Sequence, residues 1–395
     1  MTPAMVWLLA ISTGLIVANL YYAQTLVGPI AADTGLSAAA AGLIVTLTQA
    51  GYCLGLLFIV PLGDLLENRR LIVTALLVTA LAMLAAALAP SAAVFLSAAL
   101  CIGLGSVAAQ VLVPFAAHLA PEATRGQIVG KVVSGLLIGI MLARPAASLV
   151  ADHLGWHSIF YLGAGAMLLL ALLLWRRLPR RVPAATLAYG PLLASMWHLL
   201  LGTPALRRRA AYHAGMFGAF SLFWTTVPLV LASSFGLTQT QIAIFALVGM
   251  AGAVASPVAG YLADCGHTRS ATTAALVLGI AAFALALAVP GRGTPALAAL
   301  VLASILLDMG VAANLVLGQR TIFALGAEVR SRLNGIYFSL FFAGGAFGSA
   351  GGGWMVASYG WTATLLLGAA LPLLALVYQL SEYLPAEPAA KRTAS

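Results

Sequence analysis

Twelve stretches of this chain are long and apolar enough to cross a lipid bilayer as helices. A helix needs about 20 predominantly apolar residues to span the hydrocarbon core. Only 7% of the residues are charged, far below the roughly 25% of a soluble domain. We therefore predict an all-α polytopic membrane protein with twelve transmembrane helices, and not an outer-membrane barrel, whose strands are shorter and alternate in polarity. The stretches lie near residues 5–30, 40–62, 71–90, 92–117, 128–150, 156–175, 210–234, 240–262, 271–290, 295–318, 333–357 and 361–381.

The basic residues predict how these helices are oriented. If the N-terminus is cytoplasmic, 17 of the 19 lysines and arginines lie in cytoplasmic segments. The exceptions are Arg292, in an outer loop, and Arg144, inside a span. This is the positive-inside pattern, so we expect a multi-pass protein of the cell inner membrane with both termini in the cytoplasm. The position of the basic residues at the cytoplasmic membrane surface then explains the net charge of +9, which indicates no nucleic-acid partner.

The longest polar break divides the chain into two parts with six predicted spans each. It covers residues 176–209 and carries arginine clusters at both ends. Its apolar middle, 187–201, is too short to span, which predicts an amphipathic segment at the membrane surface. We expect 1–175 and 210–395 to form separate bundles joined by this cytoplasmic linker.

The two parts also match each other in sequence at an offset of about 200–206 residues. Asp64 corresponds to Asp264, and Gly155 corresponds to Gly360, with a tryptophan after each glycine. Several matches at nearly one offset indicate an internal repeat. The prediction is two pseudo-symmetric six-helix bundles with a substrate site between them near the middle of the membrane.

A short motif in the loop after the second span of each half carries a family resemblance. In the second half, Gly260-Tyr-Leu-Ala-Asp264 is followed by Arg269; in the first half, Asp64 is followed by Arg69 and Arg70. These two degenerate copies resemble the Gly-x-Leu-Ala-Asp-[Arg/Lys]-x-Gly-Arg-[Arg/Lys] motif of the major facilitator superfamily. The resemblance extends over essentially the whole chain. It implies a secondary active transporter that works by alternating access as a monomer and needs no cofactor.

The same motif suggests a gate. The resemblance implies ion-pair latches at the cytoplasmic ends of the spans, which would hold the two halves together when the protein is open to the outside. The alternative is a solvated turn. The residues of these latches would be Asp64, Arg69, Arg70, Asp264 and Arg269.

Two further stretches are similar to the twelve-span efflux branch of that superfamily, which holds drug/proton antiporters, sugar exporters and purine-nucleoside exporters. One is the opening Asn19-Leu-Tyr-Tyr-Ala-Gln24. The other is the fifth span, where the exporters carry a Gly-x-x-x-Gly-Pro-x-x-Gly-Gly motif. Here Gly135, Gly139 and Pro145 resemble its first two glycines and its proline, and its terminal glycines are absent. Arg144 departs from that motif, because it takes a place usually given to a small residue.

Asp308 is the only acidic residue well inside a predicted span, and Arg144 is the only basic residue deep inside one. Placing a charge there costs about 3 kcal/mol on insertion scales, so such residues are functional by default. A buried carboxyl can take up and release a proton near neutral pH, and we hypothesise that Asp308 couples transport to protons. Arg144 needs an anionic or carbonyl partner. The rise of the helices suggests that Arg144 and Asp308 differ in depth by on the order of 10 Å. Three roles for Arg144 therefore stay open: a direct ion pair with Asp308, contact with an anionic substrate, or a lock between the halves.

Uncharged polar and aromatic side chains form a second candidate set. Polar groups would be unsatisfied against lipid, so they should face other helices or a cavity. Aromatic rings with amides suit a flat, mostly neutral substrate, although contacts between helices explain any single residue equally well. The set consists of Asn19, Tyr21, Tyr22, Gln24, Gln49, Tyr52, Gln110, Trp224, Thr225, Thr226 and Asn314.

The leading functional hypothesis is proton-coupled efflux, by antiport, of a small organic molecule such as a drug, a nucleoside or a sugar. Proton-coupled uptake by symport and a receptor of the same fold without flux remain alternatives. The sequence contains no Walker A motif for ATP. Its six dispersed histidines, among which His213 is a minor proton-relay candidate, form no metal motif. A lone carboxyl does not make an intramembrane active site, so we expect no enzyme.

Overall fold

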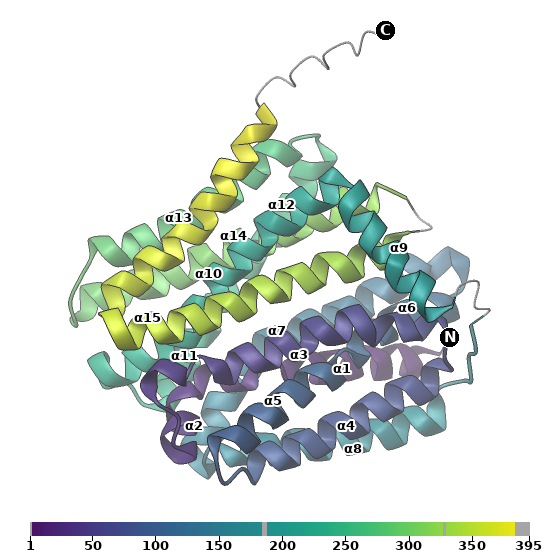
Figure 1. Cartoon of the computed structure of the whole chain (residues 1–395), viewed down its shortest axis with the longest axis horizontal. Coiled ribbons are helices and arrows are strands. Elements are labelled where there is room, and N and C mark those ends of the chain that lie inside the picture. Colours follow the sequence, from purple (N-terminus) through teal and green to yellow (C-terminus); the bar gives the residue numbers. More distant parts are fainter. Residues whose placement is uncertain (1, 184–187, 327–328, 384–395) are drawn as a thin grey trace, which may run out of the picture.

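The computed structural model describes residues 2–183, 188–326 and 329–383, and every regular element among them is helical. The helices run side by side along the long axis of the molecule (Figure 1). The N-terminal half, coloured purple to blue, lies along one side, and the C-terminal half, green to yellow, lies along the other. The twelve predicted stretches all fall on helical segments. The first, fourth and eighth are divided between successive α-helices, and the last two are merged into one helix.

The N-terminal half contains the first six predicted spans. The first span is broken: α1 ends at Ala18 and α2 begins at Val27. Pro29 helps to explain the break, because it has no N–H to donate to the carbonyl of Thr25 four residues earlier. The fourth span is divided into α5 and α6. The elements are α1 (Pro3–Ala18), η1 (Tyr22–Thr25), α2 (Val27–Thr34), η2 (Ala38–Ala40), α3 (Leu43–Phe58), η3 (Val60–Asp64), α4 (Asn68–Ala87), α5 (Ala92–Ser106), α6 (Ala108–Leu119), η4 (Glu122–Thr124), α7 (Arg125–Leu154) and α8 (His157–Arg177).

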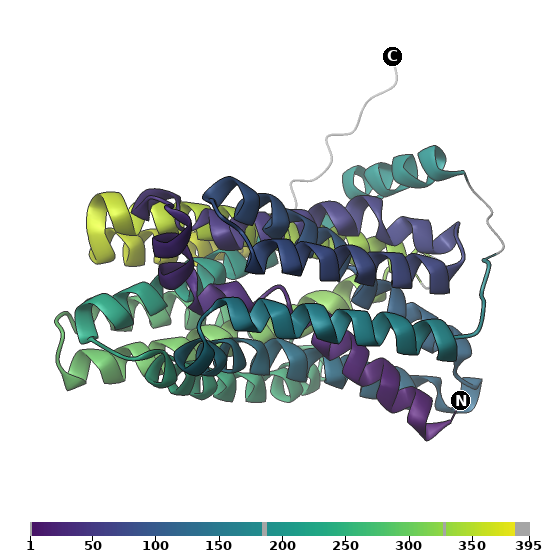
Figure 2. The same ribbon diagram turned by 90° about the horizontal axis from the view of Figure 1, so that it is seen from below.

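The C-terminal half follows a short helix, α9, which occupies most of the predicted amphipathic segment. Figure 2 shows α9 beside the bundle of long helices. The elements are α9 (Tyr189–Gly202), α10 (Pro204–Phe235), α11 (Gln239–Gly249), η5 (Met250–Val254), α12 (Ala255–Asp264), α13 (Thr268–Ala288), α14 (Thr294–Phe323), α15 (Arg330–Leu380) and η6 (Ser381–Tyr383).

Within the described residues, ten helical segments are long and apolar enough to cross a membrane. The longest, Arg330–Tyr383, contains two spans, because Gly360 interrupts it with a φ of 80°. Gly155 has the same φ of 80° and separates α7 from α8. Side chains with a Cβ rarely adopt this conformation, which accounts for glycine at both equivalent bends. Together with the shorter apolar helix Pro3–Ala18, these segments are consistent with twelve spans.

Close helix packing repeats in the two halves. In the first, Gly14 of α1 meets Gly135 and Gly139 of α7, so closely that an added Cβ would overlap backbone atoms of the partner helix. In the second, Gly218 of α10 meets Gly344 and Gly348 of α15 in the same way. Small residues allow such close approach in membrane helices. The repeated contact is structural support for the pseudo-symmetry predicted from the sequence.

The halves touch along two seams. In one seam α3 packs on α15, with the Thr46 and Ser349 hydroxyls 2.8 Å apart. In the other α7 packs on α11, where the Thr240 hydroxyl donates to Asp152 at 2.5 Å. Both contacts lie far from the end of the bundle where α4, α7 and α10 begin and α8 ends. We call that end, which carries most of the arginines, the basic end.

Candidate functional site at the junction of the two halves

A buried ion pair joins the two halves near the middle of the long helices. Nη2 of Arg144, from α7, lies 3.6 Å from Oδ2 of Asp308, from α14. The Arg144 side chain is 3% exposed and the Asp308 side chain is 11% exposed. The two intramembrane charges singled out in the sequence are thus direct partners.

The pair is closer than the predicted axial offset suggested. Measured from the basic end, Arg144 lies 19 residues from the start of α7, and Asp308 lies 15 residues from the end of α14. The difference of four residues corresponds to an axial offset of about 6 Å between the two backbone positions. The long arginine side chain covers this distance.

Trp224 of α10 completes the centre. Its indole Nε1 donates a hydrogen bond of 3.0 Å to Oδ1 of Asp308. The Arg144 guanidinium lies 3.9 Å from the centre of the same indole and 5.2 Å from the ring of Phe220. Cation–π contacts of this kind are worth up to about 2 kcal/mol when the cation is desolvated. One tryptophan therefore contacts both charges and holds them together.

Small residues of the neighbouring helices make room for this arrangement. A Cβ at Gly249, in α11, would collide with the Trp224 ring, and one at Gly252 would collide with Asp308. On the opposite side, the Thr25 hydroxyl donates to the backbone carbonyl of Arg144 at 3.3 Å. The centre is therefore enclosed by α7, α10, α14, the α11–η5 region and η1.

Several buried polar atoms at or beside the centre have no hydrogen-bond partner among the residues that the structure describes. They are Nε and Nη1 of Arg144, both amide atoms of Gln24, and the hydroxyl of Thr225. Gln24 lies on η1, which packs against both α7 and α10. Leaving a buried donor unpaired costs about 1–3 kcal/mol. The centre therefore has hydrogen-bonding capacity that a ligand or water can use.

Other predicted substrate residues link helices near the centre. Gln49 of α3 donates to the Ser221 hydroxyl of α10 at 2.9 Å, across the junction of the halves. Gln110 of α6 donates to the Tyr52 hydroxyl at 3.0 Å. These residues are buried or half-buried, and each amide already has a partner.

Asn19 and Tyr22 are not part of this centre. The Asn19 amide nitrogen lies 3.3 Å from the sulfur of Met167 in α8. Tyr22 lies against Gly163 of the same helix. Both residues therefore contact α8 of their own half. Tyr21 is also buried. The Thr226 hydroxyl donates to the Leu222 carbonyl of its own helix at 2.7 Å.

A second buried polar group lies closer to the basic end. The Asn314 amide nitrogen is 3.0 Å from Nδ1 of His213. The histidine ring stacks on Phe341 with centroids 4.4 Å apart and lies near-parallel to Tyr337. Asn314, predicted to bind substrate, thus joins α14 to α10 within the C-terminal half.

Four of the predicted gate residues form ion pairs in the structure. Arg69 and Arg70 both pair with Glu67, at 3.4 and 2.9 Å. Arg69 also lies 4.5 Å above the ring of Trp175 at the end of α8. Asp64 is exposed. Because Glu67 directly precedes α4, it is closer to the first turn of that helix than Asp64 is.

In the C-terminal half, Asp264 pairs with Arg320 at the end of α14. Arg269 instead lies 3.7 Å from Glu382. Each of these ion pairs lies within one half of the molecule, and none of them joins the two halves. Gating by these residues stays a prediction.

Sequence reasoning missed Phe220, Ser221, Gly249 and Gly252. A signal for the first two existed: Phe217, Phe220, Ser221 and Trp224 follow the spacing of one helix face. The glycines had no such signal, because their contribution is only the space they leave. Among the described residues, no three His, Cys, Asp or Glu side chains cluster as a metal site would require.

The fold and this junction define a class: a multi-pass helical membrane protein built from two related bundles with charged residues between them. The Major Facilitator Superfamily sequence profile matches residues 9–291 and 210–395, and the chain belongs to that family. Relatives of this chain are named as transporters. The Escherichia coli O157:H7 protein named "Uncharacterized transporter YgaY" is 40% identical over 380 residues, 95% of each chain.

Two further comparisons agree. The Streptomyces coelicolor protein named "Probable transporter SCO4007" is 33% identical over 360 residues, covering 90% of this chain and 82% of that protein. Among solved structures, a bacterial homolog of the human lysosomal transporter Spinster superposes with a TM-score of 0.77 over 97% of both chains. At 14% sequence identity, that likeness establishes the shared fold alone.

Proposed function

We propose that this protein is a proton-coupled secondary active transporter that exports a small organic molecule by alternating access. The observation that carries the proposal is the Arg144–Asp308 ion pair, which joins the halves inside the apolar interior. We assign Asp308 as the proton-coupling residue and Arg144 as its partner.

The coupling follows from the charges. Removing one partner of a buried ion pair leaves an uncompensated charge, at a cost of about 3–5 kcal/mol. Protonation of Asp308 cancels its charge, so the attraction that holds α14 to α7 weakens. A neutral carboxyl can still accept the Trp224 hydrogen bond. Protonation thereby favours a state in which the halves separate at this point, and a proton gradient can drive the change.

The direction we propose is efflux. It rests on Gly135, Gly139 and Pro145, which resemble the exporter motif. A related sequence supports it: the Helicobacter pylori (strain HPAG1) protein named "Probable sugar efflux transporter" is 26% identical over 230 residues, 58% of each chain. A drug, a nucleoside or a sugar is the expected substrate class for this direction.

A second candidate, symport of a proton with an organic anion, is favoured by one observation. Nε and Nη1 of Arg144 are buried and have no hydrogen-bond partner among the residues that the structure describes, and a carboxylate accepts strong hydrogen bonds from guanidinium donors such as these. An anion that takes Arg144 leaves Asp308 without its counter-charge, so Asp308 binds a proton more readily. Anion and proton would then bind together and move in the same direction.

The deciding experiment measures substrate flux in proteoliposomes with an imposed pH gradient. Asp308→Asn should abolish proton-driven accumulation while leaving exchange of labelled for unlabelled substrate measurable. Glu122→Gln, which removes an exposed carboxylate at the basic end, is the matched control and should transport normally. Full proton-driven transport by Asp308→Asn would overturn the coupling assignment.

The same assay separates the two candidates. Antiport predicts that lowering the pH on the substrate side weakens substrate binding, because proton and substrate compete. Symport predicts the opposite, since each assists the other. The sign of the change in half-saturating substrate concentration therefore decides between them.

For the arrangement in the cell, we propose a monomer in the inner membrane with both termini in the cytoplasm. The support is the distribution of basic residues. The moving units would be residues 1–175 and 210–395, with 176–209 as the linker. In that linker, the Tyr189 hydroxyl donates to the Phe58 carbonyl at 2.8 Å, and Arg332 of the second half donates to Ser195 at 2.9 Å, so α9 contacts both units.

A further inference from the structure

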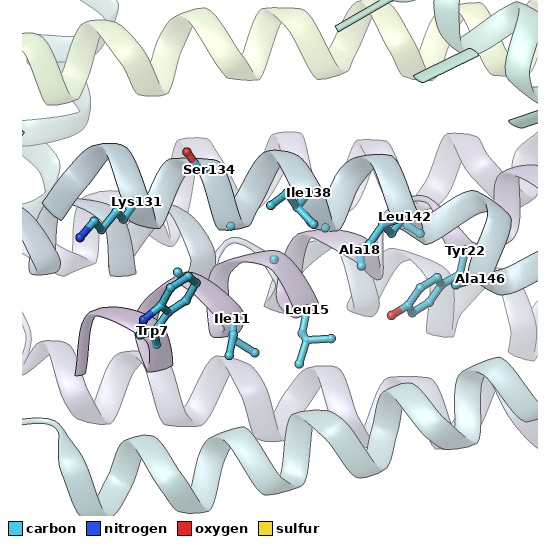
Figure 3. Close-up of a pocket in the computed structure, with 15 residues that line it drawn as sticks. Trp7, Ile11, Leu15, Ala18, Tyr22, Lys131, Ser134, Ile138, Leu142 and Ala146 are labelled. Carbon is cyan, nitrogen blue, oxygen red and sulfur yellow. The ribbon is translucent and has the colours of Figure 1, made fainter. Parts of the chain in front are cut away.

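A long groove runs between α1 and α7, away from the charged junction. Its volume is about 430 Å³. Glycines and alanines of both helices form its floor, and the larger side chains along it are Trp7, Ile11, Leu15, Ile138 and Leu142. Figure 3 shows these side chains spaced along the two helices.

The close contact between the helices explains the shape of the floor. Gly14 meets Gly135 and Gly139 with backbone against backbone, so no side chain fills the space above the contact. The large apolar residues lie one turn apart on either side and form the walls. The groove is thus a consequence of the two glycines that resemble the exporter motif.

The groove faces outward from the junction of the two halves. Leu142 and Arg144 are two residues apart, which is about 200° around α7, so they point to opposite sides of the helix. At the far end of the groove, Tyr22 packs toward Gly163 of α8, in the same half. The Trp7 and Ile138 side chains are 65% and 55% exposed. In a membrane protein, large apolar side chains exposed on the outside contact lipid.

The two ends of the groove differ chemically. Lys131 and Trp7 lie at one end and Tyr22 and Ala146 at the other (Figure 3). The end with Lys131 is the basic end of the molecule. From Trp7 to Ala18 the helix rises roughly 16 Å, which matches the roughly 15 Å of hydrocarbon in one leaflet.

We propose that this groove binds one acyl chain of an anionic phospholipid from the leaflet at the basic end, with Lys131 contacting the headgroup phosphate. The apolar walls match the chain, and their length matches one leaflet. The single ammonium group provides charge complementarity where the headgroup lies, and a tryptophan at that depth is typical of the membrane interface. This site is independent of the proposed transport mechanism.

The test uses the full-length protein in nanodiscs of phosphatidylcholine, titrated with phosphatidylglycerol and analysed by native mass spectrometry. We expect one phosphatidylglycerol molecule to be retained in preference to phosphatidylcholine. Lys131→Gln should weaken that preference about fivefold, the equivalent of about 1 kcal/mol per basic residue near a membrane surface. Arg125→Gln removes the same charge from an exposed site on the same helix, outside the groove, and should leave the preference unchanged.

A third variant tests the groove itself. Ala146→Leu fills its far end at an exposed position, where the core is not disturbed, and should reduce retention of the lipid with Lys131 intact. The proposal is overturned if Ala146→Leu binds normally, if Lys131→Gln and Arg125→Gln lose the preference equally, or if the two lipids are retained equally. Size-exclusion profiles and melting temperatures of all three variants establish that each is folded.

Discussion

The buried pair of Arg144 and Asp308 makes a quantitative prediction about stability. Asp308→Asn preserves the shape and an acceptor for the Trp224 hydrogen bond, but it leaves Arg144 buried without a counter-charge. Removing one partner of a buried ion pair typically costs about 3–5 kcal/mol. With an unfolding entropy of about 2.1 cal/mol/K per residue over 395 residues, this corresponds to a melting temperature lower by roughly 4–6 °C.

The assay is a double-mutant cycle measured by thermal unfolding in detergent. The double variant Asp308→Asn/Arg144→Gln has no buried charge at this point, so it should be more stable than the sum of the two single losses predicts. The expected coupling energy is at least about 2 kcal/mol, within the range for residues of one network.

A matched cycle on an exposed pair provides the control. Asp264 and Arg320 also join two helices of the chain, but their side chains are 63% and 47% exposed. Exposed pairs contribute about 0.2–1 kcal/mol, so Asp264→Asn/Arg320→Gln should show only that coupling. If the buried pair couples no more strongly than this control, Arg144 and Asp308 do not stabilise each other and the argument for them as a coupling pair fails.

Three further predictions concern packing and backbone geometry. Trp224→Phe keeps an aromatic ring but removes the hydrogen-bond donor to the buried carboxylate. It should lower the free energy of unfolding, measured by chemical denaturation, by about 1–3 kcal/mol. An unchanged free energy would mean that water replaces the indole as donor. Gly139→Val should sharply reduce the yield of folded protein in size-exclusion chromatography, because the valine side chain would overlap α1. The control Gly165→Val places its side chain in open space and should not reduce the yield. Equal yields would contradict the close contact between α1 and α7. Gly360→Ala should lose about 1–3 kcal/mol, because its φ and ψ lie in a region that only glycine adopts readily. Gly190→Ala, at an open helical position, should be neutral or stabilising in the same thermal assay.

Several features of the fold could be predicted because they are local. The apolar stretches locate the spans, since a bilayer imposes one length on every helix that crosses it. Gly155 and Gly360 were recognised as equivalent from sequence alone, and both prove to be bends with the same φ. Element boundaries were less accurate: the first span is broken at Tyr22–Thr25, a short 3₁₀ turn before Pro29, which an apolar pattern does not reveal.

The contacts within the candidate site, unlike these local features, could not be predicted from the sequence. Asp308 and Arg144 were singled out because charges in hydrocarbon are costly, but their contact across 164 positions of sequence could not be computed from helical rise. Asn19 and Tyr22 had the same polar and aromatic character as Gln24, yet they face α8, while Gln24 lies on η1 between α7 and α10. The rotation of a helix about its axis depends on which neighbours it packs against.

The amino-acid sequence alone determined the class of this protein, its apolar stretches, its repeat and its two intramembrane charges, because hydropathy, charge and spacing act at each position independently of the rest of the fold. Only the tertiary structure decided that the two charges are partners, that Trp224 contacts both, and that the arginines of the loops pair within each half. Those contacts depend on distances between helices, which are set by the small residues at each crossing and not by any single segment of the chain.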